Sequence, residues 1–334
     1  MKKATLLSIL VVAVQLAVAV IAEAQQAKKI PRIGFLLGGS SSNPFRVEAF
    51  RQGLHNLGYV EGQNIEIEFR HAEGKLERLP VLAAELVQLK VDVIVANSTP
   101  ATQAAKNATK IIPIIGTGTD LVGTGLIASL AHPGGNVTGI SNLNESVGGT
   151  QLELIKDAFA GASHVAVLWD PRNAGNAAWL EKLKIAAEAL RITLQPLEIR
   201  SGPSDFEDAF SAIKRDHASA INVLQNSQNI IYRQKIFDFA AKSKLPTMYA
   251  DSTFVEAGGL MSYGYSIADS YRRVAYYVDK ILKGKKPVDL PAEQPMKFEF
   301  VINLRTAKQI GVTIPQSVLY RADKVIKESA GINR

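Results

Sequence analysis

Short apolar runs alternate with longer amphipathic stretches along this chain from Ile33 onward. Continuous apolar runs predict buried strands, whereas apolar positions that recur every three or four residues predict helices. Strands and helices in alternation are typical of β–α units wound around a parallel sheet. The predicted strands are residues 32–37, 64–69, 91–96, 111–115, 137–140, 164–169, 193–199, 219–224, 247–249, 259–263 and 298–302.

The same pattern starts again near residue 142, which predicts a second lobe. A chain of 334 residues exceeds the size at which one hydrophobic core keeps growing. We therefore expect an α/β protein of two doubly wound parallel-sheet lobes. The first comprises residues 28–141, to which about 266–285 return, and the second comprises 142–265. Because no flexible linker separates the halves, the hinge is expected to cross between them more than once. The pattern leaves the lobe of residues 290–330 open.

The first 24 residues have the order of a secretory signal peptide. Lys2 and Lys3 precede a mostly apolar stretch over residues 4–21, and an A-x-A site at 22–24 follows it. We predict cleavage after Ala24 and a periplasmic location. The alternative is a retained membrane anchor, because about 18 apolar residues can span a bilayer. Gln15 interrupts the run and favours cleavage.

Composition excludes several classes of protein. The formal net charge is +7, but the charges are scattered, and neither a basic stripe nor a reading helix for nucleic acid is visible. The chain has no Cys, so disulfides, thiolate zinc sites and a lipid-modified cysteine are impossible. The five His residues show no metal-ligand spacing, and no Ser lies in G-x-S-x-G. We expect no catalytic residue, metal or cofactor.

Ligands of open parallel sheets bind beyond the carboxyl ends of the strands, where loops and helix N-termini meet. Polar residues at those ends are the candidate binding residues. They are Ser41, Asn43, Ser98, Thr99, Thr119 and Asp120 in the first lobe, and Asn176, Gln225, Asn226 and Asp251 in the second.

The residues at three of these strand ends carry alternative interpretations. Ser98 and Thr99 precede Pro100 at a helix start, where hydroxyl and backbone N–H groups suit a carboxylate, although an ordinary helix cap explains them equally well. Asp120 could pair with an ammonium group or close a turn. The amides of Gln225 and Asn226 both donate and accept, which fits a polar solute or a loop.

Five runs resemble the ABC transporter substrate-binding proteins of the tryptophan-binding-like group. They are residues 58–64 (GYVEGQN), 91–95 (VDVIV), 98–101 (STPA), 133–139 (PGGNVTG) and 301–308 (VINLRTAK). The resemblance implies a type I periplasmic-binding fold that closes on a solute and a membrane permease as partner. It also implies that residues 99–101, Thr119, Asp120 and Asn176 face the cleft.

One segment departs from that family. Relatives commonly read Thr-Asp-Asn where this chain reads Leu224-Gln225-Asn226, and the missing acid argues against an α-amino acid as ligand. We expect a monomer that binds a small polar solute, an amino acid or related carboxylate, and does not bind nucleic acid. A ligand-sensing domain for a membrane receptor and a secreted α/β hydrolase are the alternatives.

Overall fold

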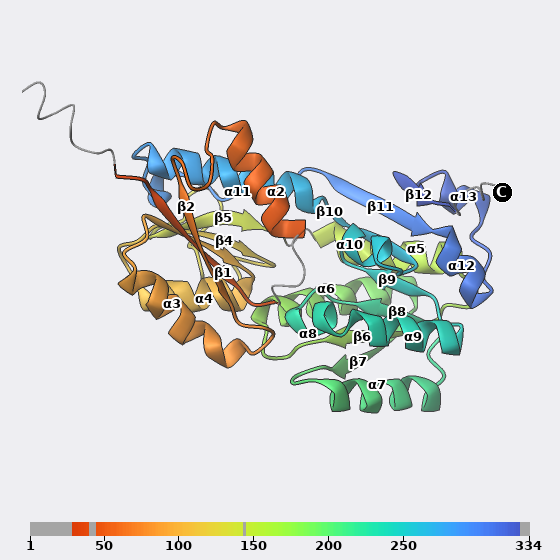
Figure 1. Ribbon diagram of the computed structural model, residues 1–334. Coiled ribbons are helices and arrows are strands. Elements are labelled where there is room, and N and C mark those ends of the chain that lie inside the picture. The colour runs from red at the N-terminus through yellow and green to blue at the C-terminus, as the bar shows by residue number, and fades with distance from the viewer. Residues whose placement is uncertain (1–28, 40–44, 143–144, 328–334) are drawn as a thin grey trace, which may run out of the picture.

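The computed structural model describes residues 29–39, 45–142 and 145–327. The predicted signal peptide, residues 1–24, lies outside these ranges. The described helices and strands gather around two sheets, which lie side by side in Figure 1. None of these helices combines the length and the apolar character that a membrane span requires.

The first sheet is parallel throughout. Its strands, in their order across the sheet, are β2 (Glu66–His71), β1 (Arg32–Leu37), β3 (Val93–Asn97), β4 (Ile114–Gly118) and β5 (Val137–Ser141). The helices are α2 (Phe45–Asn56) and α11 (Ile267–Leu282) on one face, and η1 (Leu76–Arg78), α3 (Leu79–Gln88) and α4 (Thr99–Ala108) on the other. Phe35 packs under α2 and α11, whereas Leu36 packs under α3 and α4, because successive strand side chains point to opposite faces.

The second sheet is larger. Its strands, in spatial order, are β12 (Lys324–Ile326), β11 (Phe298–Asn303), β10 (Met261–Tyr265), β9 (Thr247–Tyr249), β8 (Ala220–Val223), β6 (His164–Trp169) and β7 (Thr193–Glu198). One face carries α5 (Glu145–Ala158), α6 (Ala174–Leu190), α12 (Leu304–Ile310) and α13 (Gln316–Leu319). The other carries α7 (Pro203–Arg215), α8 (Ser227–Ile231), α9 (Arg233–Ser243) and α10 (Ser252–Glu256). The predicted architecture of two α/β lobes is confirmed.

The C-terminal part differs from the sequence-based expectation. Strand β11 runs antiparallel to β10, and β12, which periodicity did not indicate, pairs with β11. The direction follows from connectivity: the chain leaves the second sheet after Tyr265 and re-enters it at Phe298, which lies opposite Tyr265. A strand that starts at the end where its neighbour finished must run the other way. Three residues, as in β12, are too few for a periodic signal.

We propose that the chain crosses between the lobes three times, between β5 and α5, near residues 265–267 and near residues 293–298. Helix α11 packs on α2 of the first lobe, which agrees with the expected return of residues 266–285. After it, η2 (Pro287–Asp289) leads to Leu290, whose carbonyl accepts from Thr138 of β5. Residues 298–326 then belong to the second sheet, so the segment 290–330, left open by the pattern, divides at the third crossing.

Candidate functional site

A cavity lies where the carboxyl ends of the parallel strands of both sheets face each other. It holds about 920 Å³ of space not filled by atoms, part of it open to solvent. Its wall consists of Leu37, Gly39, Arg46, Leu76, Asn97, Ser98, Thr99, Pro100, Thr117, Gly118, Thr119, Asn142, Asp170, Asn173, Gln225, Asn226, Ser227, Ile230, Tyr265, Ser270 and Tyr271. Both lobes contribute polar side chains to this wall.

Helix α4 begins at the cavity. The Oγ of Ser98 accepts from the backbone N–H of Ala101 at 3.3 Å, and Pro100 occupies the first turn. The buried Thr99 Oγ1 accepts from the backbone N–H of Thr119 at 3.1 Å. The segment that caps this helix therefore also lines the cavity.

In the second lobe Asn176 positions two lining residues. Its Oδ1 accepts from the Asn226 amide at 3.0 Å, and its Nδ2 donates to the Gln225 carbonyl at 2.9 Å. Asn176 is buried and is not part of the wall of the main cavity. It therefore orients the loop after β8, where Gln225 and Asn226 face the cavity.

A buried polar network joins the lobes. The Arg46 Nη2 of α2 lies 3.3 Å from the Asp251 Oδ2 that precedes α10, and both side chains are buried. Gln225 donates to the same carboxylate and accepts from the Tyr265 hydroxyl at 2.9 Å. Burial opposes the charge of Arg46, but Asp251, helped by Tyr271 and Tyr265, outweighs it and raises the pKa of the guanidinium. Burial also raises the pKa of Tyr265, so its phenol stays a hydrogen-bond donor.

Further contacts close the cleft around the cavity. The Gln228 amide of the second lobe donates to the Gly74 carbonyl of the first at 2.8 Å. Gly175, at the start of α6, lies so near the first lobe that a Cβ on it would stand 2.6 Å from the hydroxyl oxygens of Thr99 and Thr119. The two lobes touch on several sides of the cavity.

The structure separates the candidate residues into groups. Those in the cavity wall are Ser98, Thr99, Thr119, Gln225 and Asn226. Asn176 and Asp251 stand behind them and hold them in place. Asp120 closes a turn, because its carboxylate accepts from the Gly123 N–H at 2.8 Å, and it does not line the cavity. Ser41 and Asn43 lie outside the described residues.

The strand-end rule missed several lining residues. Arg46 belongs to the first turn of α2, Tyr265 is the last residue of β10, beyond the predicted strand 259–263, and Tyr271 lies in α11, which returns to the first lobe. An arginine in an amphipathic helix looks like an ordinary surface residue, so no sequence signal marked it. The burial of Arg46 against Asp251 of the other lobe identifies it as a residue of the candidate site.

The sequence is similar to those of known substrate-binding proteins. The family model for ABC transporter substrate binding proteins matches residues 41–326. A tyrosine-binding protein of Clostridioides difficile (strain R20291) is 31% identical over 268 residues, which are 79% of this chain and 75% of that relative.

Solved structures agree with the fold. A conserved domain protein from Vibrio cholerae shares 31% identity and a TM-score of 0.82, over 89% of this chain and 100% of that one. An ABC domain from Streptococcus pneumonia in complex with L-Trp shares 29% identity and a TM-score of 0.82, over 89% of this chain and 99% of that one. These neighbours have the type I periplasmic-binding fold. The chain therefore belongs to the family of ABC transporter substrate binding proteins.

Proposed function

We propose that this protein is the extracytoplasmic solute-binding component of an ABC importer and captures an amino acid or related carboxylate by closure of its lobes. The observation that carries the proposal is the cavity walled by polar residues of both lobes. A solute that contacts both walls stabilises the closed form by its differential affinity for that form. The closed protein then docks on its membrane permease as a monomer.

The first-lobe wall supports a carboxylate as the anchoring group. The N-terminus of α4 carries partial positive charge, and the Ser98 and Thr99 hydroxyls stand beside it. Arg46 is a lining cation, although Asp251 already shares its charge. Tyrosine and L-Trp, the ligands named for two similar proteins, also carry a carboxylate.

Binding without turnover fits this wall better than hydrolysis. A secreted hydrolase needs a nucleophile with a base in hydrogen-bond reach. The described residues that line the cavity include serines but no histidine. Asp170, the lining carboxylate, is held by the Arg172 guanidinium at 2.8 Å.

Thermal-shift screening of the chain without residues 1–24 tests the solute class. A ligand at one hundred times its Kd stabilises a protein by about 2.7 kcal/mol. We expect L-amino acids or their deamino carboxylates to raise the Tm, with sugars and purines as negative controls. A response to sugars or purines alone contradicts the proposed class, and chemical conversion of the bound ligand contradicts a binding role.

Uptake by cells separates import from sensing. Deletion of the gene is expected to abolish uptake of the radiolabelled ligand, and plasmid-borne protein is expected to restore it. Normal uptake together with a lost transcriptional response to the ligand indicates the receptor domain instead.

A further inference from the structure

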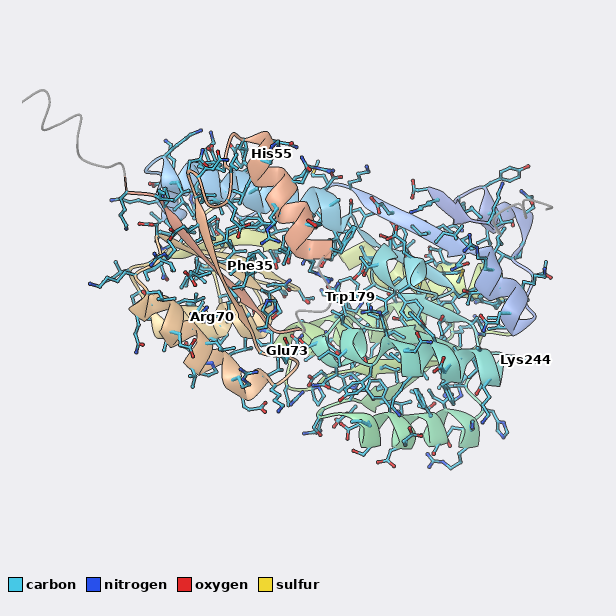
Figure 2. The ribbon with its side chains drawn as sticks, viewed as in Figure 1. Phe35, His55, Arg70, Glu73, Trp179 and Lys244 are labelled. Carbon is cyan, nitrogen blue, oxygen red and sulfur yellow. The ribbon has the colours of Figure 1, made fainter. Side chains whose placement is uncertain are left out.

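A smaller recess adjoins the main cavity. It holds about 370 Å³ of space not filled by atoms, part of it open to solvent. Thr119, Asn142, Gln225 and Tyr265 line both spaces, so the recess continues the main cavity. On the second lobe its wall includes Trp179 of α6, together with Asn176, Leu224 and Ala250. In Figure 2, Trp179 lies at the edge of the second lobe that faces the first.

Two residues that line this recess each carry a buried polar atom without a hydrogen-bond partner in the protein. These atoms are the Nε1 of Trp179 and the Oδ1 of Asn142, and each residue is only 9% exposed. An unpaired buried polar group costs about 1–3 kcal/mol. The neighbouring amides of Asn176 and Gln225, by contrast, donate and accept within the protein. One free donor and one free acceptor beside the same recess point to a partner that arrives with the solute.

The chemistry of the two atoms restricts that partner. The indole N–H can only donate, and the amide oxygen can only accept. A carboxylate has no proton for Asn142, an ammonium group has no lone pair for Trp179, and an alkyl group leaves both atoms unpaired. A hydroxyl is the smallest uncharged group that accepts from one and donates to the other. A hydroxyl also suits either orientation of the Asn142 amide, because it can form both kinds of bond.

We infer that the recess is a subsite for a hydroxyl group of the solute, which accepts from Trp179 Nε1 and donates to Asn142 Oδ1. This inference rests on the proposed function, because it assigns the far end of a solute whose carboxylate lies at Ser98 and Thr99. The protein then selects a hydroxylated carboxylate over its deoxy analogue. A site that is built to pair a hydroxyl rejects the analogue without it, because its own groups stay unpaired.

Calorimetry with three matched pairs tests the subsite. The pairs are L-tyrosine and L-phenylalanine, 3-(4-hydroxyphenyl)propanoate and 3-phenylpropanoate, and 4-hydroxybutanoate and butanoate. For at least one pair we expect the hydroxylated member to bind about ten-fold or more tightly. Trp179→Phe and Asn142→Leu are each expected to reduce that ratio to nearly one, mainly by weakening the hydroxylated member.

Trp169→Phe is the matched control. Trp169 is partly buried, and its Nε1 also has no partner, but it lines neither space, so its replacement is expected to leave the ratio unchanged. The Tm of each variant without ligand shows whether it is folded, and Asn142→Leu tests the subsite independently if Trp179→Phe is unstable.

The outcomes distinguish the two proposals. Equal binding within every pair overturns the hydroxyl subsite, and so does a preference that survives both Trp179→Phe and Asn142→Leu. In either case water occupies the recess, and the proposed carboxylate site is unaffected. Absence of binding by all six compounds, with a response to sugars or purines, overturns the proposed solute class and the subsite with it.

Discussion

Ser98 caps a helix, lines the cavity and holds an unusual backbone conformation. Its φ of +131° and ψ of 161° belong to a region that is essentially restricted to glycine. Strain of this kind costs about 1–3 kcal/mol and persists only where the surroundings fix it. Beside it, a Cβ on Gly38 would stand 3.0 Å from the Ser227 Oγ and 3.3 Å from the Ser98 Oγ, so Ser98 and Ser227 of the opposite lobe both approach Gly38 closely.

A pair of substitutions separates the cap from the strain. Ser98→Ala is expected to lower the free energy of unfolding by about 1 kcal/mol, because the cap is lost and the strain stays. Ser98→Gly is expected to preserve or raise it, because glycine adopts this φ freely and caps nearly as well. Both variants should bind ligand more weakly. Thermal unfolding without ligand checks the stabilities, and a Ser98→Gly variant less stable than Ser98→Ala contradicts the strain.

Substitution of Asp120 is expected to affect stability but not ligand binding. The Asp120 carboxylate accepts from the Gly123 N–H, and Asp120 does not line the cavity. Asp120→Ala is expected to reduce stability by about 1 kcal/mol and to leave the Kd of the ligand unchanged. Thr99→Val, a matched change in the cavity wall, is expected to raise the Kd. Calorimetry on both variants checks this prediction. Weak binding by Asp120→Ala would show that Asp120 takes part in ligand binding.

At the scale of elements, β2 is the edge strand of the first sheet and ends at His71. His71 stacks on Phe69 with ring centroids 6.2 Å apart, and its Nδ1 is buried without a partner. Burial lowers the pKa of His71, and the nearby Glu73 opposes this shift without reversing it. The folded protein therefore resists protonation of this imidazole more than the unfolded chain does.

This difference predicts a pH dependence. His in the unfolded chain titrates near about 6.5. The stabilising contribution is present above that pH and is lost as the pH falls from there through the lower pKa of the folded protein, because the unfolded state takes up the proton first. His71→Phe is expected to reduce the fall in Tm between pH 7.5 and 5. Thermal scans at both pH values check this, with His55→Phe on the exposed side of α2 as control. An unchanged fall in Tm contradicts the assignment.

At the scale of the whole molecule, closure depends on close contact between the lobes. Arg46 pairs with Asp251, Gln228 donates to Gly74, and Gly175 packs against two threonines of the opposite lobe. These contacts surround the cavity, so a solute inside is covered on both sides. A change that separates the lobes acts on affinity while each lobe keeps its own core.

Gly175→Ala tests closure directly. The added methyl would stand 2.6 Å from two hydroxyl oxygens, so the lobes cannot meet without a shift. We expect weaker ligand binding and a smaller ligand-induced decrease in radius of gyration by small-angle scattering, while the Tm without ligand is preserved. Gly149→Ala in α5 is the control, because its added methyl has only an ordinary contact at 3.7 Å. Full contraction of Gly175→Ala contradicts the steric role of this contact.

The sequence by itself determined the local features of this protein. Periodicity predicted β6 and β9 at their observed bounds, and the Ser98-Thr99-Pro100 order predicted the start of α4, because strand burial and helix capping depend on neighbouring residues. Family runs such as residues 133–139 placed the chain among substrate-binding proteins. Strand ends also identified five residues of the cavity wall.

Only the tertiary structure decided the rest. Arg46 and Asp251 are 205 positions apart, and their pairing depends on how two lobes pack, which no local pattern encodes. The route of the chain between the lobes set the direction of β11, and the packing of the lobes left Trp179 and Asn142 unpaired beside one recess. Local energetics specify which residues become strands and helices, whereas the meeting of distant surfaces specifies which of them face the solute.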